Sequence, residues 1–405
     1  MSDFLRKISF RSILLLSFLS WGPASASAQT PSLDPIIRQG NKPIRIAIES
    51  TSGYHQGLAE RAFRLHGAFE VSTASAADWI LSLNVDELRA EFAARGVDSA
   101  TTRSQGSAVG ATSDEAFRKA LDTVVRDFTG VSGFFNGMIA FVAEPTGKSE
   151  IYTSDILFES VLAVTNLKNN VVSPRWSPDG KRLIYTTYAL TGYPDIVVQD
   201  LDRKSLVPVA NYRGVNLGGR FSPDGRSIAF VASSSGSPEV YIARPDGSGA
   251  RRQTWTKGLA ATPTWSPDSQ RIVFTSDDWG GPQLILLDPA RKKTTRIKTG
   301  MGGYNAEPAW NPVSADLIAF TTLSGSEYQL AVYSFAEGRS EQLTQEPGSC
   351  VEPTWMSDGR HLAFTYRYRG SKQLKILDTQ TRKIANLHSK QLPNVSQADF
   401  TQMIR

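Results

Sequence analysis

Short runs of hydrophobic residues recur along most of the chain at a nearly constant distance. Six of them are three residues long and end in an aromatic side chain, and successive runs start 44 to 46 residues apart. Such apolar runs, bounded by Pro, Gly, Asp and Ser, are typical of buried strands. A fixed period of about 45 residues predicts a repeat architecture with one strand-rich unit per repeat. The six runs are residues 139–141, 183–185, 228–230, 272–274, 318–320 and 362–364.

A turn motif that begins with an aromatic residue precedes five of these runs. Its complete form is Trp-Ser-Pro-Asp-Gly at 176–180, where Pro presets the second turn position and Asp and Gly suit the third and fourth. We predict that the aromatic residues pack in the core, because they occupy the same position in every repeat. The repeated aspartates are predicted to be turn residues, since one carboxylate per repeat provides no metal cluster. The aromatic residues are Trp176, Phe221, Trp265, Trp310 and Trp355.

Each repeat has room for four short strands, and a single four-stranded sheet cannot bury both of its faces. Six such sheets packed around an axis bury each other, which predicts that residues 137–405 form a six-bladed β-propeller. The first repeat lacks a front strand, and a step of 45 residues from Trp355 reaches Phe400. We therefore expect the C-terminal strand to complete blade 1 and to close the ring. A helical solenoid is the alternative for this period, but helical periodicity is nearly absent from the repeats.

Residues 42–136 follow a different pattern, which predicts a small α/β domain in front of the propeller. Apolar residues alternate with polar ones over 44–48 and again over 79–85, as in half-buried strands. Between them, residues 58–65 place Leu and Ala on one face of a helix. This order predicts a β-α-β unit, and the whole chain is expected to be of the α+β class.

The end of this domain combines an expected loop with an expected helix. Residues 99–112 are rich in Ser, Thr, Gly and Ala and are predicted to form a flexible loop. Thr112 and Glu115 have the spacing of a capping box, an apolar helical face follows them, and Gly130 is a typical helix stop. The sequence therefore predicts a helix between Thr112 and Gly130.

The N-terminus has the pattern of an export signal. Basic residues precede a short apolar stretch at 13–21, and small residues lead to an expected cleavage site between Ala28 and Gln29. The apolar stretch is shorter than the roughly 20 residues that a membrane-spanning helix needs. We interpret residues 1–28 as a signal peptide and 29–41 as a mobile tail. The mature chain is expected to be exported and to lack a membrane span.

Charge and cysteine content argue against two kinds of function. The formal net charge of +5 falls to +3 without residues 1–28, and the remaining basic residues form no run interleaved with aromatic ones. Nucleic-acid binding is therefore not expected. The single cysteine, Cys350, excludes an internal disulfide and a cysteine-based metal site.

The four histidines and the serine motifs give little sign of catalysis. No pair of histidines has metal-ligand spacing, and the Gly-x-Ser-x-Gly motif of serine hydrolases is absent from the sequence. His55 and His66 are predicted to be surface residues, and His361 is predicted to begin a strand. We expect no enzymatic activity, no metal and no cofactor, and we expect a monomer.

Three features occur together here: the aromatic-led turns, the segment 352–355, and the helix start at 112–119 that leads into 137–142. With this combination the chain resembles the TolB family, periplasmic proteins of the Tol–Pal system of Gram-negative bacteria. The resemblance implies a periplasmic location, a role in outer-membrane integrity and cell division, and binding of the peptidoglycan-associated lipoprotein, Pal. It also implies contact between the N-terminal region and the inner-membrane protein TolA. The front domain is expected to be a shortened form that lacks strands between Val85 and Thr112.

The resemblance implies that the partner binds at the central mouth of the propeller. The matching positions stand three residues before each aromatic residue of the inner strands, and neighbouring loop residues add to them. Glu307 and Glu352 fall in adjacent blades, which raises the question whether they share a cation. A TolB-like scaffold with another envelope partner and a propeller hydrolase or lyase are the alternatives. The expected partner-binding residues are Ser173, Asn216, Leu217, Gly218, Thr262, Asn305, Ala306, Glu307, Val351, Glu352 and Gln397.

Overall fold

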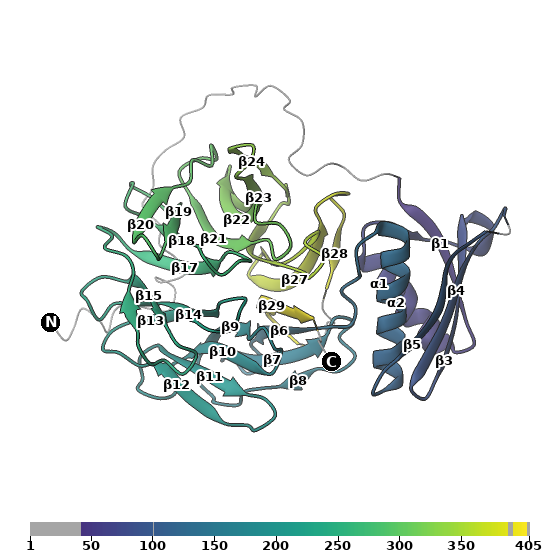
Figure 1. The fold of residues 1–405 in the computed structure, drawn as a ribbon, viewed down its shortest axis with the longest axis horizontal. Helices are drawn as coiled ribbons and strands as arrows, with labels where there is room; N and C mark the ends of the chain where they lie inside the picture. Colours follow the sequence, from purple (N-terminus) through teal and green to yellow (C-terminus); the bar gives the residue numbers. More distant parts are fainter. Residues whose placement is uncertain (1–41, 100, 388–391, 403–405) are drawn as a thin grey trace. The chain divides into compact units, whose positions relative to one another are not determined.

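The structure of the protein is a computed structural model, drawn in Figure 1. It describes residues 42–99, 101–387 and 392–402. The predicted signal peptide and the predicted tail at 29–41 lie outside the described residues, as does His388. All described residues belong to one compact unit.

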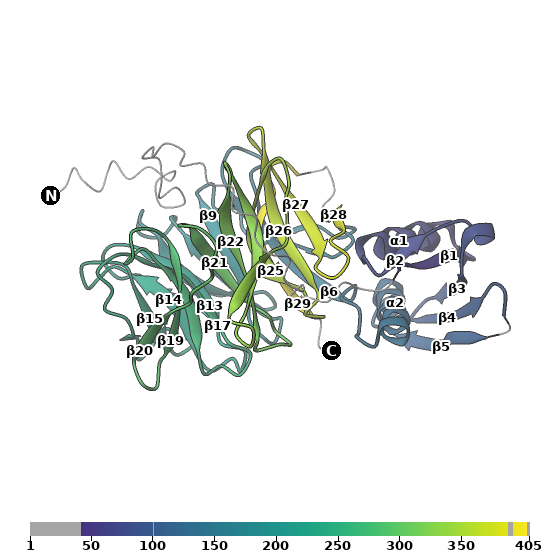
Figure 2. The same ribbon diagram turned by 90° about the horizontal axis from the view of Figure 1, so that it is seen from above.

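A five-stranded sheet and two long helices form the N-terminal domain, and both helices lie on the same face of the sheet (Figure 2). β1 pairs in parallel with β2 and β3, and β4 and β5 continue antiparallel from β3, so the order is β2-β1-β3-β4-β5. The predicted β-α-β unit is confirmed as β1, α1 and β3. The elements are β1 (Ile44–Ser50), α1 (Gly53–Leu65), β2 (Phe69–Val71), a 3-10 turn (Ala74–Ala76), β3 (Trp79–Asp86), β4 (Arg89–Gly96), β5 (Thr102–Val109) and α2 (Ser113–Thr129).

The capping residues of α2 are the ones that the sequence indicated. The Thr112 hydroxyl accepts a hydrogen bond from the Glu115 N–H at 3.2 Å, and Gly130 ends the helix with a left-handed φ of 81°. The Glu115 carboxylate accepts from the N–H of Ala111 at 2.7 Å, one residue before the predicted capping-box partner. The predicted helix is confirmed, with a cap that extends to the preceding residue.

The predicted loop at 99–112 is wrong, because most of it is strand β5. The expected absence of strands between Val85 and Thr112 is also wrong, since β4 and β5 fill this segment. β5 is an edge strand whose inward positions carry small residues, Ser104 and Gly106. Gly106 leaves space that Phe92 fills, and a Cβ added there would lie 3.1 Å from the Phe92 ring. A strand that packs through small residues lacks the apolar alternation by which strands are recognised in a sequence.

Six four-stranded sheets follow and form a β-propeller, as predicted (Figure 1). In blade 1 the C-terminal strand β29 pairs antiparallel with β6, Phe400 opposite Ile139, so the two ends of the propeller meet in one sheet. Blade 1 contains β29 (Ser396–Gln402), β6 (Gly137–Ala143), β7 (Glu150–Asp155) and β8 (Leu162–Ala163); blade 2 contains β9 (Val171–Trp176), β10 (Arg182–Thr187), β11 (Asp195–Asp200) and β12 (Leu206–Ala210); blade 3 contains β13 (Asn216–Phe221), β14 (Ile228–Ala232), β15 (Glu239–Ala243) and β16 (Arg251–Arg252).

Blades 4 to 6 repeat this order of strands from the axis outwards. Each blade begins with an inner strand and adds its neighbours antiparallel, one after another. Blade 4 contains β17 (Ala260–Trp265), β18 (Ile272–Ser276), β19 (Gln283–Asp288) and β20 (Lys293–Arg296); blade 5 contains β21 (Asn305–Trp310), β22 (Leu317–Ser324), β23 (Glu327–Ser334) and β24 (Arg339–Gln342); blade 6 contains β25 (Ser349–Trp355), β26 (His361–Tyr368), β27 (Ser371–Asp378) and β28 (Ile384–Asn386).

The repeated aromatic residues and aspartates have the structural roles that the sequence predicted. All five aromatic residues at the ends of inner strands are buried, and two indoles also bond to the preceding blade: Trp265 Nε1 donates to the Arg220 carbonyl at 3.2 Å and Trp355 Nε1 to that of Ala309 at 3.0 Å. In the turn of blade 3, Asp224 accepts from the Ser222 hydroxyl at 2.6 Å and from the Arg226 N–H at 3.1 Å. The repeat therefore encodes both the strand ends and the contacts between blades.

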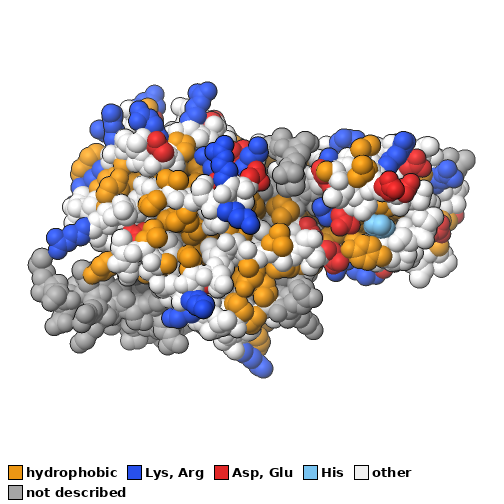
Figure 3. Space-filling view, turned by 90° about the horizontal axis from the view of Figure 1, so that it is seen from below, with side chains coloured by type: hydrophobic (Ala, Val, Ile, Leu, Met, Phe, Trp, Pro, Cys, Tyr) orange, Lys and Arg blue, Asp and Glu red, His pale blue; other side chains and the backbone are white. Residues whose placement is uncertain are grey.

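The surface mixes charged and apolar groups. On the face shown in Figure 3, acidic and basic side chains lie next to one another over the N-terminal domain. On the propeller, several Lys and Arg side chains project one by one from its margin. In the part of the chain that the structure describes, none of the helices is long and apolar enough to cross a membrane.

Candidate functional site

The six positions three residues before the inner aromatics share one unusual backbone conformation. Each has a left-handed φ, between 48° and 66°, although only Gly218 is a glycine. Five inner strands and β29 show an irregular register at this point, which is the mark of a β-bulge. Left-handed geometry in five non-glycine residues is maintained against a steric cost of roughly 1–2 kcal/mol each. We call these positions the mouth ring: Ser173, Gly218, Thr262, Glu307, Glu352 and Gln397.

Hydrogen bonds join neighbouring members of the mouth ring from blade to blade. Glu307 accepts from the Glu352 N–H at 2.8 Å, and the Gln397 amide donates to Glu352 at 3.3 Å. Gln397 in turn accepts from the Ser173 N–H at 2.8 Å. These bonds connect blades 5, 6, 1 and 2, so the structure brings the predicted positions together around the axis.

The link from blade 4 to blade 5 uses an intermediate side chain. The Thr275 hydroxyl lies 2.9 Å from the Thr262 hydroxyl and accepts from the Glu307 N–H at 3.3 Å. Gly218 has no side chain with which to continue the series into blade 3. The mouth ring is therefore polar at five of its six positions and lacks a side chain only at Gly218.

The two glutamates of the mouth ring are in different electrostatic states. Burial raises the pKa of Glu307, and the neighbouring Glu352 carboxylate raises it further. Burial would also raise the pKa of Glu352, but Arg367 and two side-chain donors outweigh it and lower that pKa. The Arg367 guanidinium donates to Glu352 at 2.7 Å. Arg367 thus supplies the positive charge that a cation shared by the two glutamates would otherwise provide.

The loop residues expected beside the ring differ in accessibility. Asn216 and Asn305 are fully buried, and their side-chain amides donate to the carbonyls of Tyr212 at 2.8 Å and Met301 at 2.7 Å. Ala306 and Val351 are also buried, and Leu217 is half-buried. These asparagines hold the loops in shape, so the accessible surface of the expected site comes from the mouth ring and Leu217.

A concave pocket of about 460 Å³ lies beside the ring, at hairpin tips of blades 5 and 6. We call it the rim pocket. Sequence analysis did not find it, because its walls come from two hairpins more than 20 residues apart. Arg367 belongs both to this pocket and to the pair with Glu352, so the pocket is continuous with the mouth ring. It is lined by Glu327, Gly348, Arg367, Tyr368, Arg369, Gly370, Ser371 and Lys372.

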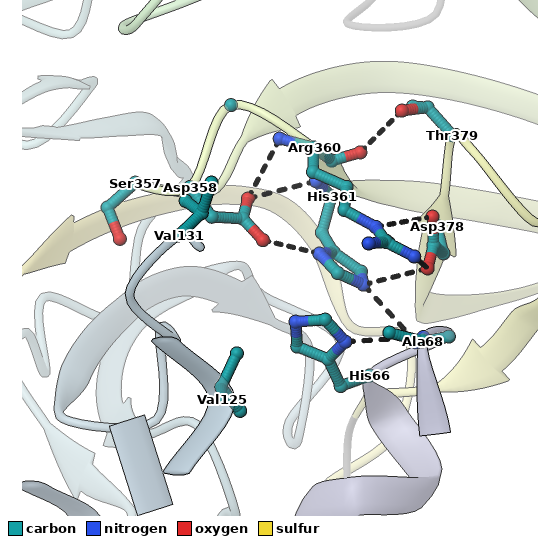
Figure 4. A network of polar contacts seen from close by, with 12 residues as sticks. His66, Ala68, Val125, Val131, Ser357, Asp358, Arg360, His361, Asp378 and Thr379 are labelled. Atoms are coloured by element: carbon teal, nitrogen blue, oxygen red, sulfur yellow. Dashed lines mark hydrogen bonds and ion pairs between the residues drawn. The ribbon is translucent and has the colours of Figure 1, made fainter. Parts of the chain in front are cut away.

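A second charged cluster joins the end of α1 to blade 6 (Figure 4). The prediction that His66 is a surface residue is wrong: its side chain is only 1% exposed, and its ring centroid lies 4.3 Å from that of His361. Sequence analysis failed here because contacts between segments almost 300 residues apart leave no local pattern. We call the group the His361 cluster: His66, Asp358, Arg360, His361 and Asp378.

The charges of the His361 cluster balance if His361 carries a proton. His361 Nδ1 lies 2.5 Å from the Asp358 carboxylate, and Nε2 lies 3.5 Å from Asp378. Burial opposes protonation of His361, but the two carboxylates prevail and raise its pKa to about 9. Burial lowers the pKa of His66 well below its usual value. The Gly67 N–H lies 3.4 Å from Nε2, but an uncharged amide affects the protonation of His361 less than the charges of Asp358 and Asp378 do.

Two cations and two anions therefore compensate each other in the cluster. Arg360 donates to both oxygens of Asp378, at 2.6 and 3.0 Å for its shortest contacts. Three cluster members, His66, Asp358 and His361, also place potential metal-ligand atoms within 4.8 Å of one another. The direct 2.5 Å contact, however, uses Nδ1 of His361 as a donor to Asp358, which leaves that nitrogen without a lone pair for a metal.

The fold and the site define a class: a six-bladed β-propeller protein with a small N-terminal α/β domain and a polar ring at its mouth. Residues 125–392 match the TolB β-propeller domain family, PD40. The chain belongs to this family, as the sequence features indicated.

Individual relatives agree with this assignment. The chain is 32% identical over 137 residues to a TolB homolog of Chlorobium chlorochromatii, covering 34% of this chain and 30% of the relative. It is 32% identical over 156 residues to the Tol-Pal system protein TolB of Anaeromyxobacter dehalogenans, covering 38% and 36%. The aligned part thus spans about a third of each relative. The crystal structure of TolB from Acinetobacter baumannii superposes with a TM-score of 0.80 at 23% identity, over 90% of this chain and 98% of the other, and shows the same fold.

Proposed function

We propose that the protein is a periplasmic binding protein whose propeller mouth receives a protein partner, Pal, within the Tol–Pal system. The observation that carries this proposal is the mouth ring: six equivalent bulges, of which four are joined directly by hydrogen bonds, beside a concave pocket. A rigid scaffold that maintains left-handed backbone at six equivalent positions is typical of a binding surface rather than of a packing element.

Membership of the TolB family supports the partner, and a curated relative carries the Tol-Pal name. The role that follows is recognition without turnover: the propeller binds Pal, and the assembly supports outer-membrane integrity and cell division. The segment before residue 42 would provide export through its signal peptide and contact with TolA. We propose 42–136 and 137–405 as the two domains of the exported chain.

The accessible members of the mouth ring are expected to contact the partner. The Glu352 side chain is only 8% exposed and is held ionised by Arg367, so it fixes the position of the Arg367 guanidinium, which is 34% exposed and can face the partner. The rim pocket adds Arg369, whose side chain lies over the Tyr368 ring at 5.1 Å and is exposed. A partner surface with both signs of charge would fit this combination.

Isothermal titration calorimetry with the soluble Pal domain of the same organism tests the proposal. We expect one-to-one binding, weakened about tenfold or more by Glu352→Gln, because Arg367 loses the charged partner that positions its guanidinium. Glu87→Gln, an exposed turn residue of the N-terminal domain, is the matched control and should bind like the wild type. Absence of binding by a folded protein would contradict the Pal assignment and favour the alternative, a TolB-like scaffold with another envelope partner.

A further inference from the structure

A second ring of side chains lies two residues further along the inner strands than the mouth ring. We call these positions, each directly before the inner aromatic, the waist ring. Contacts between blades connect its members: Arg220 Nη1 donates to the Thr264 hydroxyl at 2.8 Å, and the Thr354 hydroxyl donates to Asp399 at 3.3 Å. Unlike the mouth ring, it carries two cations. Its members are Arg175, Arg220, Thr264, Ala309, Thr354 and Asp399.

The single carboxylate of the waist ring does not satisfy both guanidinium groups. Asp399 Oδ1 lies 3.9 Å from Arg175 Nε and 4.0 Å from Arg220 Nη2, which is within ion-pair range but beyond hydrogen-bonding distance. Its other oxygen, Oδ2, accepts from the N–H of Trp176 at 2.8 Å. Two positive charges therefore face one negative charge, and that charge is already used to join two blades.

Arg220 is the less satisfied of the two arginines. A guanidinium has five N–H donors, and within the described residues Arg220 makes one hydrogen bond, to Thr264. Burial lowers the pKa of Arg220 to about 10, and the positive charge of Arg175 adds to this effect. The side chain nevertheless keeps 20% of its surface accessible, so its remaining donors are open to small solutes. Arg175 uses Nη1 on the Pro174 carbonyl at 2.9 Å and keeps 21% of its surface.

We propose that the waist ring binds a small oxyanion between the guanidinium groups of Arg175 and Arg220. The ligand class is phosphate or carboxylate, whose oxygens match the planar fork of an arginine. The Thr264 oxygen accepts from Arg220 and from the Trp310 N–H at 3.4 Å, which leaves its own proton to donate to the anion. The site is formed by positions two residues further along the inner strands than the mouth ring, so its arginines are distinct from the residues of the proposed Pal surface.

Calorimetric titration of the full-length protein with sodium phosphate at constant ionic strength tests the inference, and a parallel titration uses sodium acetate. We expect saturable binding at one site per chain for phosphate, or for acetate if carboxylate is the ligand. Arg220→Gln and Arg175→Gln should each weaken binding about tenfold, since a charged hydrogen-bond donor is lost. Arg213→Gln, an exposed arginine in the loop before β13, is the matched control and should not change it.

Arg220→Lys is a second variant, which remains informative if the glutamine variant does not fold. Lysine keeps the charge but not the two-pronged donor geometry, so binding should weaken while the thermal melt stays that of the wild type. Equal affinity in the wild type, Arg220→Gln and Arg175→Gln would overturn the proposal, and so would the absence of saturable heat with both anions. Because Pal is absent from the titration, its result does not depend on the proposed function.

Discussion

Charged groups meet inside the protein both at the mouth ring and at the His361 cluster, but their surroundings differ. Glu307 and Glu352 each stand on a bulge that recurs in every blade, and Arg367, the partner of Glu352, is 34% exposed while the Glu352 side chain is 8% exposed. His361 and Asp378 are fully buried and occur once, where α1 meets blade 6. The pair at the mouth ring therefore keeps its cation partly exposed, whereas the unique contact encloses both of its carboxylates and His361.

This difference separates the proposed binding surface from a contact that joins the end of α1 to blade 6. In the His361 cluster both histidines and both carboxylates are buried, and Gly67 is packed so closely that an added Cβ would lie 2.2 Å from Asp378. A buried, compensated ion pair stabilises little by itself, but the loss of one partner costs several kcal/mol. At the mouth ring, Arg367 keeps 34% of its side chain exposed although its partner Glu352 keeps only 8%, so another protein can reach the guanidinium without unfolding the propeller.

Removal of β29 should have the largest effect, because it removes the mouth ring's closure along with Gln397. Without residues 394–405, the edge of β6 that pairs with β29 is unpaired. The hydrogen bond from the Trp176 N–H to the Asp399 carboxylate is also lost. We expect the cooperative unfolding transition to disappear in a calorimetric melt. A melt like that of the full chain would show that the ring does not need this closure.

The sequence predicted the regular region well and the unique contact poorly, for a physical reason. The positions of Ser173 and Gln397 follow from a 45-residue count, since every blade repeats the same strand and bulge. His66 and Asp378 meet only because a helix end packs against one blade, and no short-range pattern encodes that distance. β5 was missed for a third reason: Ser104 and Gly106 pack inward without being hydrophobic.

The pairing of Arg367 at the mouth ring could not be predicted from the sequence either. Its sequence neighbours mark a hairpin, but nothing local indicates that its guanidinium turns back to Glu352 rather than to solvent. The waist arginines could be found by the repeat count, yet their imbalance with Asp399 becomes visible only in three dimensions. Position within a repeat is therefore predictable, while pairing between side chains of different strands is not.

The pH dependence of stability should sharpen the comparison, with an effect of intermediate size. His361 has a folded pKa of about 9 against an unfolded value of 6.5, so its contribution is complete below pH 6.5 and is lost as pH rises through 9. The shift corresponds to a contribution on the order of 3 kcal/mol. The neutral His66 acts in the opposite direction, but only as pH falls below 6.5. Chemical denaturation at pH 6.5 and pH 9 measures the difference.

His361→Gln is the variant that assigns this pH effect. Glutamine does not titrate, so its stability should differ less between the two pH values than that of the wild type. The groups that face His361 are His66 from the end of α1, Asp358 and Arg360 from the turn before β26, and Asp378 from β27. An unchanged pH slope in the folded variant would show that His361 is not the protonated group.

The smallest expected effect distinguishes the two glutamates of the mouth ring. Glu352→Gln leaves the Arg367 guanidinium without its charged partner, which should destabilise the fold by about 1–3 kcal/mol. Glu307→Gln should change stability by less than about 1 kcal/mol. Burial and the neighbouring Glu352 carboxylate raise the pKa of Glu307, so its charge stabilises the fold less than that of Glu352 does, and the amide oxygen of glutamine can still accept from the Glu352 N–H. Chemical denaturation of both variants at pH 7 measures the pair. Equal losses would mean that Arg367 serves both glutamates alike, and the mouth ring would then resemble the His361 cluster, with its charges fully compensated within the protein.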